Sequence, residues 1–272
     1  MKIFIRDKNV CENCKRKTCV MCDVVERILF ARFKTERYTC PVRYLQLEPT
    51  DEQINAGRID CATAKDENAS LQCIHCGLCI LKCSQGNLEV VREGVDKFNS
   101  FLETTCSQNV GVANILATSF LNVLFEFSAN TNLNKALLFD GIVSDKQGRY
   151  AFVEVDEGDD SLESCRRLLG DIVQHNFENP RNKITAGLMV LRNIPKLGNR
   201  DVFTFIERLA KFPQTSMIDM YVTTFGILRE LTLKFGGQNF KFGDLLYNVS
   251  RESFEEYVAK MDALNISIGD RR

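Results

Sequence analysis

The pattern of apolar and polar positions changes between residues 92 and 110, and the two sides of this boundary predict different structures. Before it, short apolar segments such as Ile3 to Ile5 alternate with cysteines and charged residues. After it, longer apolar segments recur at helical spacing and at strand spacing in turn. Helices that alternate with strands are typical of an α/β sandwich. We therefore expect two domains, residues 1–95 and residues 108–272.

The C-terminal domain is predicted in more detail from these periods. The expected helices span 112–127, 160 or 161 to about 175, 201–212 and 253–264, and the expected strands span 136–143, 150–156, 184–191 and 217–224. The segment from Asp145 to Gly148 predicts a hairpin turn, with glycine where a positive φ is needed. In the helix after it, Leu162, Leu169, Ile172 and Val173 are expected to face inward.

The strand over 150–156 carries acidic side chains among apolar ones. Its period of two places Phe152, Glu154 and Asp156 on one face and the intervening apolar residues on the other. Asp140 belongs to the preceding strand. Antiparallel pairing of the two strands would bring these carboxylates close together, as a hard divalent cation such as Mg²⁺ or Mn²⁺ requires. The alternative is that the acids form a solvated edge beside a turn.

Composition narrows the class of protein. The 272 residues are 44% hydrophobic, which excludes general disorder. The sequence has no run of about 18 apolar residues that would cross a membrane, and its first residues are too charged for a signal peptide. We therefore expect a cytoplasmic protein without a membrane partner. Twelve cysteines in such a chain indicate metal binding rather than disulfides.

Charge is distributed unevenly along the chain. Residues 1–43 hold 11 Lys and Arg against 5 Asp and Glu, while residues 44–272 hold 24 against 31. A basic segment beside an acidic one suits a protein that binds a phosphate backbone and holds metal with its acids. A plain solvated basic surface explains the charge equally well.

The clearest chemical signal is the spacing C-x2-C-x2-C-x3-C formed by Cys73, Cys76, Cys79 and Cys83. Three thiolates at steps of three residues can surround one corner of an iron–sulfur cube, and the fourth points toward a second cluster. Gly77 removes a side chain where the backbone passes close to the inorganic core. Zinc sites usually have two C-x2-C pairs separated by a longer loop. This run resembles the cluster motif of bacterial-type ferredoxins.

The resemblance covers about residues 1–92 and implies an α+β ferredoxin-like domain with two [4Fe-4S] clusters. The first cysteine group is Cys11, Cys14, Cys19 and Cys22, and Cys40-Pro41 resembles the ending of such a motif. The segments 45–48 and 57–60 resemble the strand pair that lies between the motifs. By the family's crossed pairing, Cys40 would join Cys73, Cys76 and Cys79, while Cys83 would join three of the first group. The sequence departs from the family in two ways: Cys83 is followed by Ser84 rather than proline, and Cys61 is a cysteine beyond those that two clusters need. The first cysteine group by itself also suits a zinc site.

The acidic constellation resembles the PD-(D/E)xK nuclease superfamily over about residues 110–195. This resemblance implies an α/β restriction-endonuclease-like domain, with a central mixed sheet flanked by helices. Asp140 and Glu154 match the acids that hold the divalent cation, and Glu126 matches a helical glutamate of some members. Asp156 stands where the family has lysine. A positive charge would then come from Arg166, Arg167 or Lys183.

Three functions follow from these readings. The first is an iron–sulfur-containing, divalent-metal-dependent endonuclease that hydrolyses phosphodiester bonds of double-stranded DNA, in a restriction system, with a homodimer as the expected assembly. Its catalytic residues would be Asp140, Glu154, Asp156 and Glu126. The second is a ferredoxin-like electron-transfer subunit, although the C-terminal part carries no flavin or nicotinamide fingerprint. The third is an inactive nuclease fold that only binds nucleic acid.

The remaining histidines and cysteines are expected to be structural. His75 lies inside the cysteine motif as a spacer. His175 ends an amphipathic helix, where it would contact terminal carbonyls. Cys106 and Cys165 are expected to be small buried hydrophobic residues.

Overall fold

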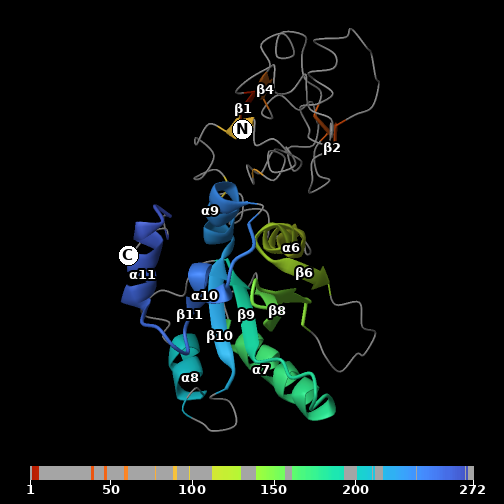
Figure 1. Ribbon diagram of the computed structural model, residues 1–272, viewed down its shortest axis with the longest axis vertical. Coiled ribbons are helices and arrows are strands. Elements are labelled where there is room, and N and C mark those ends of the chain that lie inside the picture. The colour runs from red at the N-terminus through yellow and green to blue at the C-terminus, as the bar shows by residue number, and fades with distance from the viewer. Residues whose placement is uncertain are drawn as a thin grey trace. The chain divides into compact units, whose positions relative to one another are not determined.

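A computed structural model of the chain divides into two compact units, Met1–Asn109 and Val110–Arg272. Each unit is described by itself (Figure 1). In the first unit the structure describes five short strands together with Gly77 and Phe98. In the second it describes residues 112–129, 139–156, 161–192, 201–209, 211, 217–236, 238–266 and 268.

The strands of the first unit form two small antiparallel sheets. The first sheet has the order β4-β1-β5, with β1 (Lys2–Ile5) between β4 (Arg58–Asp60) and β5 (Leu88–Val90). In the second sheet, β2 (Tyr38–Thr39) pairs with β3 (Gln46–Leu47). The predicted strand at Ile3 to Ile5 is therefore confirmed.

The predicted pairing between the segments 45–48 and 57–60 is wrong. Both segments contain strands, but β3 pairs with β2, and β4 pairs with the N-terminal strand β1. Residue pattern identifies a strand, whereas its partner depends on the path of the whole chain. This sheet arrangement does not by itself indicate a ferredoxin-like domain.

Gly77 is the one residue of the cysteine motif that the structure describes. It is buried and has a φ of 77°, in the left-handed region where a side chain is rarely tolerated. This conformation explains why glycine occupies the position. The predicted cluster ligands lie outside the described residues: Cys11, Cys14, Cys19, Cys22, Cys40, Cys73, Cys76, Cys79 and Cys83.

The second unit is built on a six-stranded mixed sheet with the order β11-β10-β9-β8-β7-β6. Strands β8, β9 and β10 are parallel, and the pairs on either side of them are antiparallel. The strand bounds are β6 Glu126–Ala129, β7 Gly141–Ser144, β8 Tyr150–Asp156, β9 Ala186–Leu191, β10 Asp219–Thr224 and β11 Tyr247–Asn248. The expectation of an α/β unit with a mixed central sheet is confirmed.

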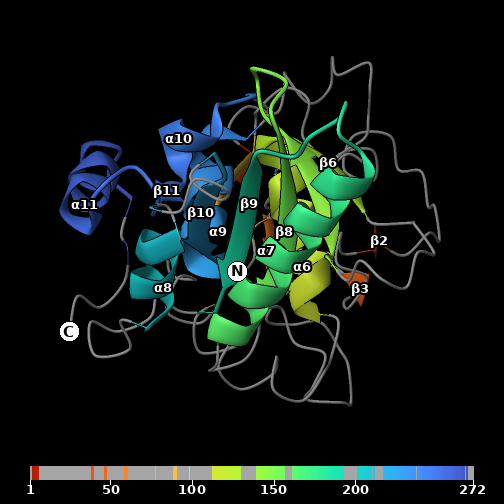
Figure 2. The ribbon, with the colours of Figure 1, turned by 90° about the horizontal axis from the view of Figure 1, so that it is seen from below.

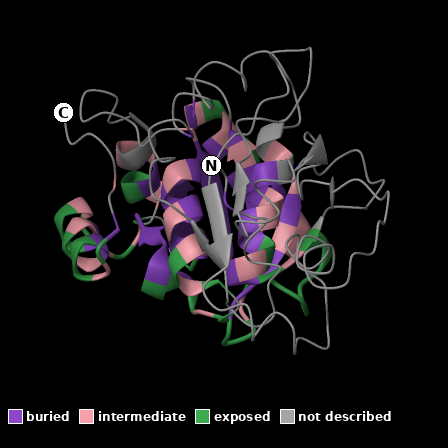
Figure 3. Ribbon diagram, turned by 90° about the horizontal axis from the view of Figure 1, so that it is seen from above, coloured by how far each residue is buried: buried purple, intermediate pink, exposed green. Residues whose placement is uncertain are grey.

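Helices cover both faces of this sheet (Figures 1 and 2). The helix bounds are α6 Val112–Leu124, α7 Ser161–Glu178, α8 Asp201–Leu209, α9 Phe225–Phe235, α10 Phe242–Leu245 and α11 Phe254–Ala263. Helix α6 packs against α9, and α7 packs against α8 and on β8 and β9. The sheet-facing sides of the helices are buried (Figure 3). Each large apolar side chain buried there contributes about 1.5–3 kcal/mol.

Helix α7 lies over the face of β8 that carries the acidic residues. The ring of Phe152 in β8 contacts the edge of His175 in α7, with 5.1 Å between ring centroids. On β9, a Cβ atom at Gly187 would lie 3.1 Å from Ile172 and 3.2 Å from Leu168, both in α7, so this helix packs closely on the same face. Because β8 alternates with a period of two, Glu154 and Asp156 share the face of Phe152 and lie under α7.

Two helix predictions need correction. The predicted helix over 112–127 ends at Leu124, and Glu126–Ala129 is the edge strand β6. The apolar run Leu-Phe-Glu-Phe gives no stop signal, so only pairing with β7 reveals the change. Val173, which was expected to face inward, is 50% exposed. Elements β6, α9, α10 and β11 were not predicted.

The β7–β8 hairpin has the predicted turn. Gly148 has a φ of 71°, and its N–H donates to the carbonyl of Asp145 at 2.8 Å. The buried Asp145 carboxylate accepts hydrogen bonds from Arg149, at 3.0 and 2.8 Å, and from the N–H of Phe242, at 3.2 Å. These bonds tie the hairpin to the start of α10 and hold β8 in place.

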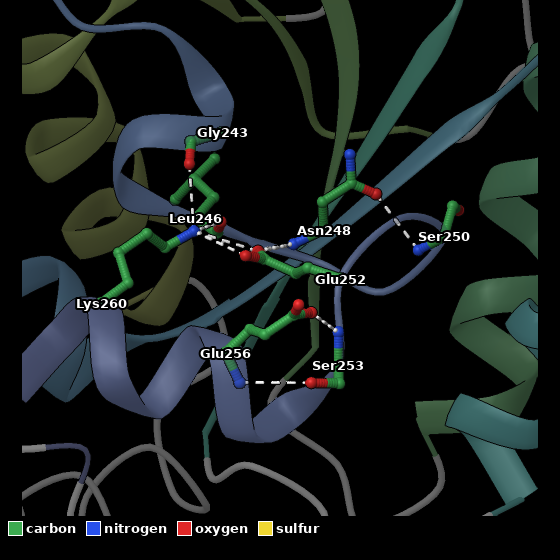
Figure 4. A network of polar contacts seen from close by, with 8 residues as sticks. All are labelled: Gly243, Leu246, Asn248, Ser250, Glu252, Ser253, Glu256 and Lys260. Carbon is green, nitrogen blue, oxygen red and sulfur yellow. Dashed lines mark hydrogen bonds and ion pairs between the residues drawn. The ribbon is translucent and has the colours of Figure 1, made fainter.

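Helix α11 confirms the predicted helix over 253–264 and is attached by a polar network (Figure 4). Ser253 and Glu256 form a capping box at its start. Lys260 donates to both carboxylate oxygens of Glu252 and to the carbonyl of Leu246. Among the described helices, none is both long and apolar enough to span a bilayer.

Candidate functional site

The candidate site lies where β7 begins beside the end of β8. Asp140 comes directly before β7, and its N–H donates to the carbonyl of Val153 at 2.8 Å. Its carboxylate accepts a hydrogen bond from the N–H of Val155 at 2.8 Å. These two contacts fall on either side of Glu154, so Asp140 is held beside that residue as the sequence predicts, although it precedes β7 (Gly141–Ser144) and is not part of the strand.

The carboxylate of Asp140 also reaches the helix that precedes the sheet. Asn114 of α6 donates to it at 3.2 Å. Burial raises the pKa of Asp140 above its usual value, and the hydrogen bonds from Val155 and Asn114 and the charge of Arg167 oppose this effect only in part. Sequence analysis missed Asn114, because α6 carries three other polar residues, Thr118, Ser119 and Asn122, and nothing in the sequence singles out Asn114 among them.

Glu154 is the most buried acid of the site, with only 1% of the residue exposed. Its Oε1 forms an ion pair with the guanidinium of Arg167 in α7. Its Oε2 is buried and has no hydrogen-bond partner among the described residues. A buried carboxylate oxygen without a partner is costly, and it is the kind of atom that a metal ion or a donor from a ligand satisfies.

Asp156 lies two residues beyond Glu154 on the same face of β8 and is 8% exposed. Along β8, Asp156 is two residues farther from Asp140 than Glu154 is, a distance of about 6.5–7 Å. In the part of the chain that the structure describes, no three Asp, Glu, His or Cys side chains converge as metal ligands would. The described acids of the site are therefore a pair, Asp140 and Glu154, with Asp156 nearby.

Glu126 lies away from this pair. It is the first residue of β6, opposite Ser144, whose hydroxyl donates to it at 3.2 Å. Ala129, at the other end of the same strand, is the residue that pairs with Gly141 next to Asp140. Glu126 and Ala129 are three residues apart, which places Glu126 about 10 Å along the strand from the position beside Asp140. The expectation of a helical glutamate is wrong, since the helix ends before this position.

Of the three basic candidates, Arg167 is the one that contacts an acid of the site. Its neighbour Arg166 points elsewhere: it pairs with Glu163 at 3.7 Å and lies over the ring of Phe205. Lys183 is exposed in the segment after α7. Adjacent arginines on one helix thus have different surroundings.

The other predicted residues have structural surroundings where they are described. The expectation that His175 ends its helix and contacts the terminal carbonyls is wrong, because α7 continues to Glu178 and a ring nitrogen of His175 lies 3.1 Å from the carbonyl of Asn182, beyond the helix. Cys165 is fully buried, as predicted, and burial raises the pKa of its thiol to about 12. His75 and Cys106 lie outside the described residues.

No family model, curated protein or solved structure matches the chain. The order of elements around the site is helix, three antiparallel strands, helix and parallel strand, from α6 through β9.

Proposed function

We propose that the C-terminal unit is a divalent-metal-dependent endonuclease of PD-(D/E)xK type that cuts double-stranded DNA in the cytoplasm. The observation that carries this proposal is the placement of Asp140 beside Glu154 of β8, through its hydrogen bonds with Val153 and Val155, with a buried Glu154 oxygen that has no hydrogen-bond partner among the described residues. The element order from α6 to β9 supports it, because the family resemblance implies a helix, a hairpin with the acids, a helix and a further strand.

The residues of the site suit a hard cation. Asp140 and Glu154 offer carboxylate oxygens, which Mg²⁺ and Mn²⁺ prefer, and solvent and substrate phosphate would complete the coordination. A bound cation would supply a water of lowered pKa and neutralise charge on the scissile phosphate. Asp140 is preorganised for this role, since Val155 and Asn114 fix its carboxylate.

For the N-terminal unit we propose two [4Fe-4S] clusters in a ferredoxin-like domain, held by the cysteines of the two motifs. Their role would be structural, because thiolate–iron bonds couple cluster binding to folding. The basic segment 1–43 would then contact the phosphate backbone. The electron-transfer alternative concerns this same segment and stays a hypothesis for it.

A nuclease fold that only binds DNA is the second candidate, and two observations favour it. Asp156 stands at the position of the family's lysine, and Arg167 already neutralises Glu154. In this case the chain would bind DNA with or without a divalent cation, and no bond would be cut.

Plasmid cleavage separates the two candidates. Anaerobically purified protein is incubated with supercoiled plasmid of varied sequence in Mg²⁺, in Mn²⁺ and in EDTA. We expect cleavage only with a divalent cation, and loss of cleavage with retained DNA binding in Asp140→Ala and Glu154→Ala. Glu126→Ala is the matched control, an acid on the same sheet outside the pair, and it should cut normally. DNA binding without cleavage in every condition would favour the second candidate.

A further inference from the structure

The side chain of Arg167 is partly exposed to solvent, and its guanidinium pairs with the buried carboxylate of Glu154. Its side chain is 42% exposed, whereas that of Glu154 is 2% exposed. The guanidinium therefore reaches Glu154 from the surface of α7, and it can leave without any change in the sheet. Arg166, one residue earlier, is exposed and bound to Glu163 and Phe205, so it provides an internal comparison.

The ion pair has an electrostatic reason. A buried carboxylate without a cation is strongly unfavourable, and Arg167 compensates the charge of Glu154. A divalent cation that binds Glu154 and Asp140 would do the same with twice the charge. A guanidinium and a divalent cation on one carboxylate repel each other, so the two compete.

We propose that Arg167 is an exchangeable cation. It neutralises Glu154 in the metal-free protein, gives way when a divalent cation binds, and then donates to the phosphate of the DNA. This inference rests on the proposed nuclease function. In the family that the site resembles, a lysine supplies a positive charge at the position of Asp156 on β8. The proposal gives this role to Arg167 on α7, because a guanidinium forms strong bidentate hydrogen bonds with phosphate.

The proposal predicts opposite effects of one substitution on two measurements. Removing the competing guanidinium should tighten Mn²⁺ binding in the absence of DNA. The same substitution should slow cleavage, because the phosphate loses a donor of positive charge. If Arg167 had only a structural role, its substitution would weaken both Mn²⁺ binding and cleavage or change neither of them.

The test measures Mn²⁺ binding to the full-length protein by electron paramagnetic resonance, with cleavage rates measured in parallel. The Asp140→Ala/Glu154→Ala double variant defines binding elsewhere on the chain. We expect Arg167→Gln to bind Mn²⁺ about 10-fold more tightly and to cut about 10²-fold more slowly, the usual effect of losing one transition-state donor. Arg167→Lys should recover part of the cleavage, and Arg166→Gln should leave both measurements unchanged.

The outcomes distinguish this inference from the function on which it rests. Unchanged or weaker Mn²⁺ binding in Arg167→Gln, with normal loss of binding in the double variant, would overturn the exchangeable cation and leave the metal site standing. Equal Mn²⁺ binding in wild type and the double variant would overturn the metal site itself. Far-ultraviolet circular dichroism establishes that each variant is folded, and Arg167→Met, which also lacks the positive charge, repeats the binding test if Arg167→Gln is not folded.

Discussion

The carboxylate of Asp140 and the backbone N–H of Val155 are joined by a 2.8 Å hydrogen bond that closes the open end of the β7–β8 pair. Val155 lies between Glu154 and Asp156, so the bond positions Asp140 against the acidic stretch of β8. With the hydrogen bond from Asn114 to the other oxygen, both carboxylate oxygens of Asp140 have a structural partner before any ligand is present. Asp140 is expected to serve both the stability of the strand pair and the chemistry of the site.

Substitutions at Asp140 should separate these two roles. Asp140→Asn keeps an oxygen that accepts from Val155, whereas Asp140→Ala leaves that N–H without its partner. We expect Asp140→Ala to lose about 1–2 kcal/mol of unfolding free energy and Asp140→Asn to lose less. Both should lose metal-dependent cleavage. Urea unfolding monitored by circular dichroism measures the first effect, and equal stability of the two variants would argue against the structural role.

Asp156 should tolerate substitution better than the acidic pair. It is one strand period beyond Glu154, and the described residues do not form a three-acid group. We expect Asp156→Ala to cut within about 10-fold of the wild-type rate, a change of about 1.4 kcal/mol in the barrier. Asp156→Lys restores the family's cation and should cut faster. A dead Asp156→Ala variant with normal DNA binding would instead make Asp156 a third ligand.

Sequence predicted the part of the site that depends on local pattern. The bounds of β8 follow from the mostly apolar segment between Tyr150 and Asp156, which is rich in aromatic residues and valine, and the turn before it follows from Gly148. Both signals arise within a few residues, so no tertiary information is needed. The nearness of Asp140 to Glu154 then follows from hairpin geometry.

Sequence could not predict features that depend on distant packing. Helix α9 follows β10 directly, with Thr224 as its cap and Gly226 in its first turn, so no loop separates the strand from the helix. Arg166, Arg167 and Lys183 are equivalent as charged residues in the sequence. Only the way α7 lies on β8 brings Arg167 to Glu154.

The buried Asp145 should make the unfolding free energy depend on pH. Burial by itself raises the pKa of Asp145, but hydrogen bonds from Arg149, Phe242 and Gln147 outweigh it, and its pKa falls below the usual value. The contribution of the Asp145 carboxylate to the unfolding free energy is therefore fully present above about pH 3.9, the ordinary aspartate pKa. It is lost as the pH falls through the lower pKa of the folded state.

Asp145→Asn tests this dependence. The variant should lose about 2 kcal/mol at pH 7, because hydrogen bonds to a charged group are weakened. The difference from wild type should shrink below about pH 4, where the carboxyl of the unfolded chain is already protonated. Guanidinium chloride unfolding at several pH values measures it, with Asp244→Asn, an exposed acid of α10, as the control. A difference independent of pH would contradict the role of charge.

The cysteine motif predicts the metal content of the N-terminal unit. Two cubane clusters would give about eight irons per chain in anaerobically prepared protein. Cys76→Ala should reduce the iron content and lower the melting temperature, because cluster binding is coupled to folding. About four irons with one zinc would identify the first cysteine group as a zinc site. Absence of iron after anaerobic reconstitution would contradict the cluster assignment.

Glu154→Gln tests the catalytic claim most directly, because it changes charge with little change in shape. The amide keeps an oxygen that accepts from Arg167, but it is a poor ligand for a divalent cation. The measurement is the single-turnover rate of plasmid cleavage in saturating Mg²⁺, with DNA affinity determined on the same samples in Ca²⁺. We predict a rate at least about 10²-fold below wild type with unchanged affinity for DNA. Equal cleavage rates for Glu154→Gln and wild type would contradict the account.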